Sequence, residues 1–138
     1  MKFYVFLIAL FGLVFAEVKS ISREEVTKHR LGCLIQNPNA SEYFVKILNF
    51  EYPDVPEVNA YMDCVAEKLG LVDLKTNQIN VDGVAAFFSV DPNNAEDMDI
   101  IKNCVVKPEE EGLHVRSKCL CLLNTKLRDN LKKYLVEA

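Results

Sequence analysis

The chain has no tryptophan and only two histidines, five glycines and five prolines among its 138 residues. Neither His29 nor His114 stands in a catalytic or metal-binding motif such as Gly-x-Ser-x-Gly or His-Glu-x-x-His, so the sequence does not indicate an enzyme, a metal site or a cofactor. A net charge of −4 also argues against nucleic acids and anionic membranes as partners. Because no repeat or Gly/Ser-rich linker divides the chain, we expect one domain.

The sequence contains a single long apolar run, Phe3–Phe15, which follows Lys2 and ends at the small residue Ala16. This run is shorter than the ~20 residues that a membrane-spanning helix needs, so stable membrane insertion is not expected. The pattern is typical of a secretion signal. We therefore expect residues 1–16 to be a signal peptide cleaved before Glu17, and residues 17–138 to be a secreted, extracellular domain. The sequon at Asn39 is a candidate glycan site in that compartment.

Apolar residues recur at helical spacing along nearly all of residues 17–138, and turn residues divide them into segments. No strand-like alternation continues beyond a few residues. The sequence therefore predicts an all-α fold, an irregular bundle of about six helices around an apolar interior. The first expected helix is opened by a Ser22–Glu25 capping box and stopped at Asn37. The next four are a short one at 43–48, one from Pro56 to Gly70, a short one at 84–88 and one at 98–105. The last begins between Pro108 and Gly112 and continues to Val136, with an apolar face made of Leu120, Leu123, Leu127, Leu131 and Tyr134.

The turn-rich link from Asp73 to Asn80 has several oxygen-bearing side chains, as a calcium loop would. A loop starting at Asp73 would have Gln78 at the sixth position, where a calcium loop needs glycine. It would also have Val84 at the twelfth position, where a bidentate glutamate is needed. The link therefore does not fit a calcium site, and no metal ligands are predicted.

Five cysteines, at positions 33, 64, 104, 119 and 121, predict disulfides in a secreted domain of this size. Cys119 and Cys121 are two residues apart on one expected helix, about 200° apart around its axis, so they should not bridge each other. The most economical arrangement pairs Cys33 with Cys64, and Cys104 with either Cys119 or Cys121, leaving one free thiol. Two such bridges would each contribute roughly 3 to 4 kcal/mol.

The sequence resembles the insect odorant-binding protein family, which includes pheromone-binding and general odorant-binding proteins. The similarity is carried by the signal peptide, Cys33 in the first helix, the string Ala60–Val65 around Cys64, and the link Leu69–Asn80. Ala60 stands where the family has its second cysteine, and Glu110 or Gly112 stands where it has its fifth. The second and fifth cysteines pair in the family, so the chain resembles the minus-C branch, which lacks that bridge.

This resemblance implies an all-α shell around an apolar cavity, on the order of several hundred Å³, that holds a small hydrophobic molecule. It implies a secreted carrier that binds and solubilises odorants, pheromones, fatty acids or related lipids. Tyr61, and also Tyr43, could supply a hydroxyl that orients the ligand. The candidate lining residues share the apolar helical stripes or the link, and they are Phe44, Ile47, Leu48, Tyr61, Val65, Leu69, Leu74, Ile79, Val84, Phe87, Phe88, Ile101, Leu120, Leu123 and Leu127.

Two other hypotheses remain open. A secreted effector or haemolymph protein that acts through a protein partner would show a large exposed apolar patch instead of a cavity, and the sequence also leaves a homodimer open. A disulfide-stabilised hydrolase would need a pocket with convergent polar groups. Protonation of His29 or His114 near pH 6 is a further hypothesis, since it could loosen the cavity and release ligand.

Overall fold

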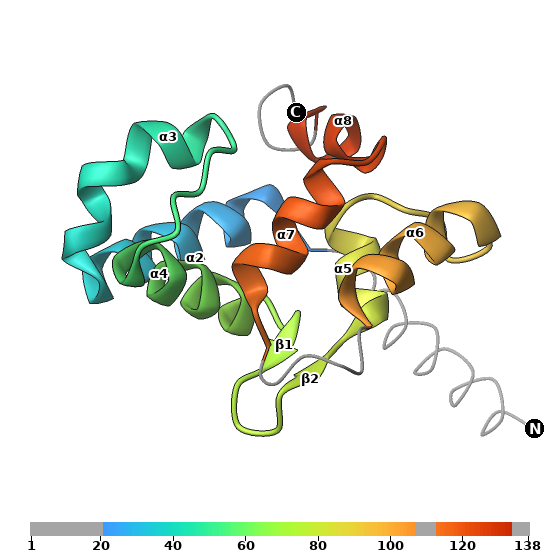
Figure 1. The fold of residues 1–138 in the computed structure, drawn as a ribbon, viewed down its shortest axis with the longest axis horizontal. Helices are drawn as coiled ribbons and strands as arrows, with labels where there is room; N and C mark the ends of the chain where they lie inside the picture. Colours follow the sequence, from blue (N-terminus) through green and yellow to red (C-terminus); the bar gives the residue numbers. More distant parts are fainter. Residues whose placement is uncertain (1–20, 107–112, 134–138) are drawn as a thin grey trace, which may run out of the picture.

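The computed structural model of the protein describes residues 21–106 and 113–133 (Figure 1). The expected signal peptide lies outside the described residues, as do the acidic run 109–111 and the last expected helical residues, Tyr134 and Val136. The described elements, in chain order, are α2 (Arg23–Gln36), the 3₁₀ helix η1 (Pro38–Tyr43), α3 (Phe44–Leu48), α4 (Pro56–Lys68), β1 (Val72–Asp73), β2 (Gln78–Ile79), α5 (Val81–Phe87), α6 (Ala95–Val105), α7 (Val115–Leu123) and α8 (Leu127–Lys132).

Short polar side chains start several of these helices by accepting hydrogen bonds from the first free backbone N–H groups. Ser22 Oγ accepts from Glu25 N at 3.1 Å, Asn80 Oδ1 from Gly83 N at 3.0 Å, and Asn94 Oδ1 from Asp97 N at 3.1 Å. Pro56 occupies the first turn of α4, where its missing N–H costs nothing. The predicted all-α bundle is confirmed, and its helices begin near the positions that the sequence indicates.

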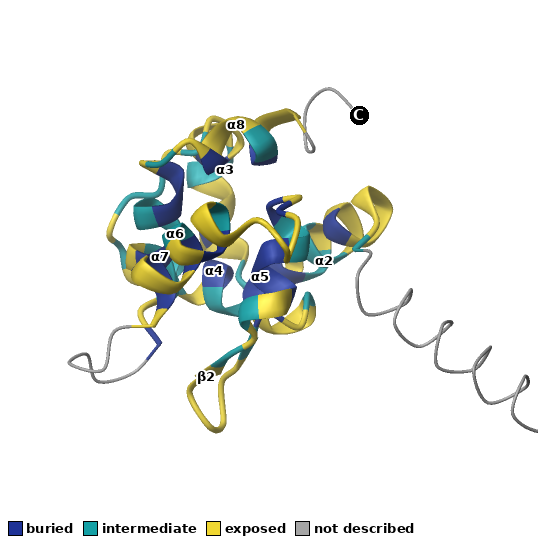
Figure 2. Ribbon diagram, turned by 90° about the vertical axis from the view of Figure 1, so that its right-hand side faces the viewer, coloured by how far each residue is buried: buried dark blue, intermediate teal, exposed yellow. Residues whose placement is uncertain are grey.

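Helices α4 and α7 contact each other at the centre of the bundle. On one side of this pair α2 packs against α4, and on the other side α6 packs against α7 and α5 (Figure 1). Residues from the inner faces, such as Val26, Val58, Ile101 and Leu127, are at most 1% exposed. Figure 2 shows the buried residues on the inner sides of the helices, while the tip of the hairpin is exposed. The interior is therefore formed between helices that are distant in sequence.

The expected last helix is wrong in two respects. The sequence predicts a start between Pro108 and Gly112, but Leu113 and His114 are not helical and α7 begins at Val115, and the structure divides the helix into α7 and α8. Thr125 lies at the break, where its hydroxyl donates to Leu122 O at 2.6 Å and accepts from Leu127 N at 3.2 Å. These bonds offer the backbone an alternative to helical hydrogen bonding, which is a common role of threonine at turns. The next residue, Lys126, forms ion pairs with Glu96 and Asp97 at the start of α6. The break therefore redirects α8 across the bundle.

The link between α4 and α5 forms a small antiparallel hairpin, which the sequence indicated only as turn-rich. Val72 pairs with Ile79, and Asp73 pairs with Gln78. The Asp73 carboxylate accepts from the N–H groups of the next residues, and Asn77 adopts a left-handed φ of 57° that closes the turn. Strands of two residues leave the all-α class unchanged.

Two disulfides join helix pairs across the bundle. Cys33–Cys64 joins α2 to α4, and Cys104–Cys121 joins α6 to α7, with Cα–Cα distances of 5.7 Å and 5.6 Å. Cys119 is the free thiol. The pairing of Cys33 with Cys64 is therefore confirmed, and of the two partners left open for Cys104 the structure selects Cys121.

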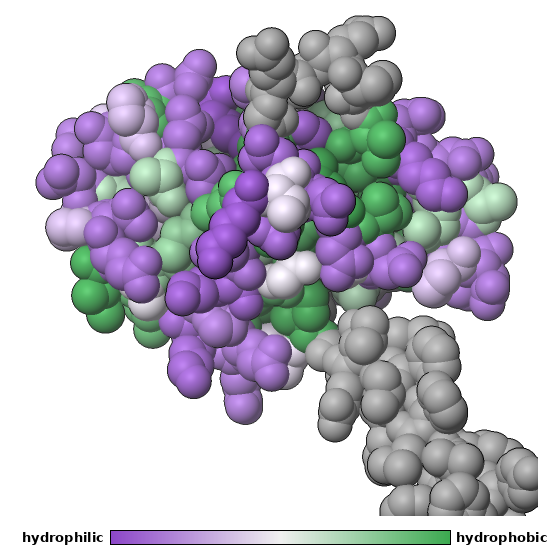
Figure 3. All heavy atoms as spheres, turned by 90° about the horizontal axis from the view of Figure 1, so that it is seen from below, coloured by the Kyte–Doolittle hydropathy of each residue, from purple (hydrophilic) through white to green (hydrophobic). Residues whose placement is uncertain are grey.

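The described surface is mostly hydrophilic. In the view of Figure 3, hydrophilic side chains cover most of the face, and hydrophobic ones gather near its centre and along one side. No helix among residues 21–106 and 113–133 has the length and hydropathy needed to cross a lipid bilayer.

Candidate functional site

A cavity of about 130 Å³ lies inside the bundle. It is partly open to solvent, and its wall is almost wholly apolar. Every described α-helix contributes to it, as do the hairpin and the loop after α3, so no single segment forms the site. The lining residues are Val26, Arg30, Ile47, Phe50, Tyr52, Tyr61, Met62, Val65, Ala66, Leu69, Leu71, Val72, Ile79, Val84, Phe87, Phe88, Val105, Val115, Lys118, Cys119, Leu122 and Leu131.

Helix α4 and the turn that follows it form the floor of the cavity. Gly70 ends the helix with a left-handed φ of 75°, which a residue with a Cβ rarely adopts, and the chain then turns back under the cavity. Asn80 fixes this turn, because its Nδ2 donates to Gly70 O at 3.2 Å while its Oδ1 caps α5. A Cβ at Gly83 would lie 2.8 Å from Asn80 Nδ2, so glycine is needed beside this cap. The turn thereby fixes Leu71 and Val72 in the wall.

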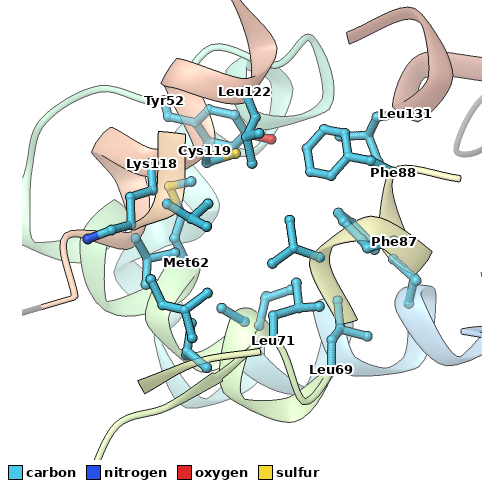
Figure 4. A pocket seen from close by; sticks show the side chains of 18 of the residues that line it. Tyr52, Met62, Leu69, Leu71, Phe87, Phe88, Lys118, Cys119, Leu122 and Leu131 are labelled. Atoms are coloured by element: carbon cyan, nitrogen blue, oxygen red, sulfur yellow. The ribbon is translucent and has the colours of Figure 1, made fainter. Parts of the chain in front are cut away.

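Aromatic and branched side chains from α5, α7 and α8 form the opposing walls. The rings of Phe87 and Phe88 pack edge to face, with centroids 5.6 Å apart and an interplanar angle of 85°. Figure 4 shows Phe88 and Leu131 on one side of the cavity, and Met62 and Cys119 on the other. Such side chains fill much of the space between the helices, and the cavity is therefore smaller than the several hundred Å³ expected from the sequence.

Few polar groups reach the cavity, and they come mainly from two tyrosines and one thiol. Tyr61 is 3% exposed, and its buried hydroxyl has no hydrogen-bond partner among the residues that the structure describes. Burial raises the pKa of Tyr52 far above its usual range, and the neighbouring Cys119 raises it further. Burial also raises the pKa of the Cys119 thiol to about 12. Both groups are therefore neutral at physiological pH.

Two cationic side chains lie in the lining and play different parts. Lys118 is buried, and its Nζ donates to Leu113 O. Figure 4 shows this nitrogen directed away from the cavity, so Lys118 presents its aliphatic stem to the wall. Arg30 is partly buried on α2 and lies in the wall without an ion pair to any described carboxylate.

The sequence-predicted lining residues divide into two groups in the structure. Those that lie in the cavity wall are Ile47, Tyr61, Val65, Leu69, Ile79, Val84, Phe87 and Phe88. Of those outside it, Leu48 and Leu74 are exposed at the surface, because each lies at or directly after the end of a short element, on a side that no other element covers. The remaining ones pack elsewhere: Ile101, Leu123 and Leu127 in the buried core, and Phe44 and Leu120 as half-buried residues. Contact of any of these residues with a ligand remains a prediction.

Several lining residues were not among the candidates. Val26 and Leu131 lie on apolar stripes that the sequence does show, so a broader list would have included them. Phe50 and Tyr52 lie in the loop before Pro53, where no periodicity marks them. Tyr52 is held there because its carbonyl accepts a 2.7 Å hydrogen bond from Arg116 Nε on α7, a contact across 64 residues of sequence.

Neither histidine lies in the cavity wall. His114 is exposed before α7, where it adopts a left-handed φ of 47°, and His29 is partly buried on α2. Ligand release driven by their protonation remains a prediction.

The fold and the cavity define an all-α, disulfide-linked binding domain. A model of the PBP/GOBP family matches residues 16–123, and the chain belongs to this family, the insect odorant-binding proteins. The two disulfides, which use four cysteines, are consistent with its minus-C subtype. The family consists of binding proteins and carriers, not of enzymes. Neither a curated protein nor a solved structure matches the chain.

Proposed function

We propose that this protein is a secreted carrier that takes up small hydrophobic molecules in the cavity between α2, α4, α5, α7 and α8. Membership of the PBP/GOBP family and the apolar wall both support this proposal. Secretion would follow from the signal peptide expected at residues 1–16, with the carrier acting in an extracellular fluid.

The apolar cavity is the observation that carries the proposal. Burying apolar ligand surface there contributes about 25 cal/mol for each Å² removed from water. An engineered apolar cavity of ~150 Å³ in another protein stays dry and takes up benzene. At about 130 Å³, this cavity is of similar size, so the favoured ligand is about as large as one six-membered ring.

Larger ligands need the wall to move. Each added methylene contributes about 0.8 kcal/mol while it stays inside the wall, which is close to a fourfold gain in affinity. Once the cavity is full, further methylenes reach solvent or displace side chains such as Phe88 and Leu131. We therefore expect affinity in an alcohol series to rise from butanol to about hexanol and then to level off.

The test is direct titration calorimetry of delipidated, fully oxidised protein with benzene, toluene and the alcohol series. One saturable site per chain supports the carrier function. Ala66, a buried wall residue of α4, offers a matched pair of variants with the exposed Ala60 of the same helix. Ala66→Phe should fill the cavity and abolish uptake, whereas Ala60→Phe should leave uptake unchanged.

Failure of the folded wild-type protein to bind any of these compounds would overturn the carrier function. Equal binding by Ala66→Phe, with its helicity retained, would place uptake outside this cavity. The first of these results would favour the effector hypothesis, for which exposed apolar side chains on α2 and α3, Leu31, Ile35, Val45 and Leu48, would be the first residues to replace.

A further inference from the structure

The cavity wall includes Arg30, Tyr52, Tyr61 and Cys119, which come from three helices and the loop after α3. Arg30, Tyr61 and Cys119 all lie close enough to Tyr52 to affect its pKa, so we call these four residues the polar end of the cavity. The other wall residues are apolar except Lys118, which presents only its aliphatic stem, so these four residues supply the polar groups that face the cavity. A ligand with one polar head and an apolar body matches such an arrangement better than a hydrocarbon does.

The charge at this end is positive. Arg30 has no ion pair with a carboxylate of residues 21–106 or 113–133, and no Asp or Glu lies in the wall. Arg30 as a residue is partly buried, and a carboxylate beside its guanidinium would supply the counter-ion that no described side chain provides. The chain as a whole carries a net charge of −4, so this local sign does not follow from its composition.

The positive charge of Arg30 also acts on the Tyr52 hydroxyl. Although burial and Cys119 raise the pKa of Tyr52, the positive charges of Arg30 and Arg128 act in the opposite direction. Tyr61 also lies close enough to affect Tyr52. The Tyr52 hydroxyl therefore lies within the field of both arginines and close to Tyr61.

The unpartnered hydroxyl of Tyr61 is an independent sign of a ligand at this location. Its oxygen is buried and finds no partner in the described part of the chain, whereas buried hydroxyls are ordinarily hydrogen-bonded. A phenol hydroxyl donates readily to an anionic oxygen, and hydrogen bonds to charged acceptors are about twice as strong as neutral ones.

We propose that the ligand is a small amphiphilic carboxylic acid, bound as the carboxylate, whose head lies between Arg30 and the hydroxyls of Tyr52 and Tyr61 while its body fills the apolar cavity. This assignment rests on the proposed carrier function and names the ligand class of the same site. Arg30 would pair with the carboxylate, Tyr61 would donate to it, and the body would lie against the side of the cavity formed by Phe88 and Leu131.

The test compares ligands that differ only in charge. Calorimetric titrations at pH 7.5 with benzoate and benzyl alcohol, and with hexanoate and 1-hexanol, separate head-group recognition from apolar burial. We expect each carboxylate to bind about ten to a hundred times more tightly than its alcohol, as one charge-assisted hydrogen-bonded pair provides.

Two arginines of α2 give matched variants. Arg30→Met keeps the apolar stem but removes the charge, and it should weaken benzoate binding at least tenfold while changing benzyl alcohol binding less than twofold. Arg30→Lys should recover part of the loss. Arg23→Met, at an exposed position of the same helix, should change neither affinity.

The outcomes distinguish this proposal from the carrier function itself. Alcohols that bind as tightly as carboxylates, or an Arg30→Met variant that retains the preference for carboxylates, would overturn the anionic head while leaving the carrier function intact. Absence of binding by both members of each pair would overturn the carrier function, and this proposal with it.

Discussion

Replacement of Tyr61 by phenylalanine removes a single hydroxyl group and thereby tests the polar end of the cavity. The hydroxyl is buried without a partner among the described residues, and the phenylalanine side chain would keep the ring in its place on α4. A buried polar group left unsatisfied costs about 1 to 3 kcal/mol, which the variant recovers. We expect Tyr61→Phe to raise the free energy of unfolding of the ligand-free protein by about 1 to 2 kcal/mol. For a domain of this size, that corresponds to a melting temperature roughly 3 to 6 °C higher.

The same change should weaken the binding of polar ligands. Loss of one hydrogen bond worth about 1 kcal/mol lowers affinity about fivefold, and more when the ligand atom is charged. Benzene or toluene, which accept no hydrogen bond of that strength, should bind as well as before or better. A residue that is only structural would not give this combination of greater stability and weaker binding.

Thermal and urea unfolding of the ligand-free protein, with calorimetric titration of benzyl alcohol and toluene, measure both effects. Tyr43→Phe is the control, because Tyr43 is half-buried outside the cavity wall and should change neither quantity. A Tyr61→Phe variant that is less stable than wild type, and that binds benzyl alcohol equally well, would refute the argument. It would show that the hydroxyl is satisfied within the ligand-free protein.

Four further predictions concern Cys119, Phe88 and one disulfide. Burial raises the pKa of Cys119 from its ordinary 9.0 to about 12, so its alkylation by iodoacetamide at pH 8 should be about a thousandfold slower than that of an exposed cysteine. Mass spectrometry of the adduct measures this rate, and a rapid reaction would contradict the prediction. The unfolded thiol ionises near pH 9 while the folded one stays protonated, so the contribution of Cys119 to stability should be complete below pH 9 and be lost as the pH rises toward 12. Phe88→Ala should lower the free energy of unfolding by about 3 to 4 kcal/mol. It should also let binding affinity in the alcohol series keep rising to longer chains before it levels off. Retained helicity with levelling at the same chain length as wild type would count against Phe88 as a cavity wall. Replacing Cys104 and Cys121 by alanine removes a bridge across 17 residues and should lower the free energy of unfolding, measured with urea, by about 3 kcal/mol. A decrease below about 1 kcal/mol would show that this bridge constrains the unfolded chain little.

Local signals in the sequence were sufficient for the helical architecture. Ser22 and Pro56 mark helix starts, and the apolar spacing of Val58, Tyr61 and Val65 marks the buried face of α4. Such signals act within a few residues, so helices can be predicted from them without knowledge of the tertiary structure. The bridge from Cys33 to Cys64 was predicted on different grounds, as the most economical link between two expected helices and as the pairing that the family resemblance supports.

The choice between Cys119 and Cys121 needed the tertiary structure. Both lie on α7 two residues apart, and only the positions of its neighbours decide which thiol meets Cys104 on α6 and which one lines the cavity. The break at Thr125 is followed by a contact that local signals do not show, because Lys126 pairs with Glu96 and Asp97, some 30 residues earlier in the chain.

The cavity itself was decided almost entirely by packing. An apolar stripe predicts that Ile101, Leu127 and Phe88 are buried, but it does not say whether a side chain meets another side chain or an empty space. Tyr52 and Arg30 carry no periodic signal for the site and come into the wall through contacts between distant segments. The sequence thus determined that this chain is a helical, disulfide-linked domain with an apolar interior. Only the tertiary structure decided where that interior stays open and which polar groups face the opening, because both depend on how side chains from every helix meet in space.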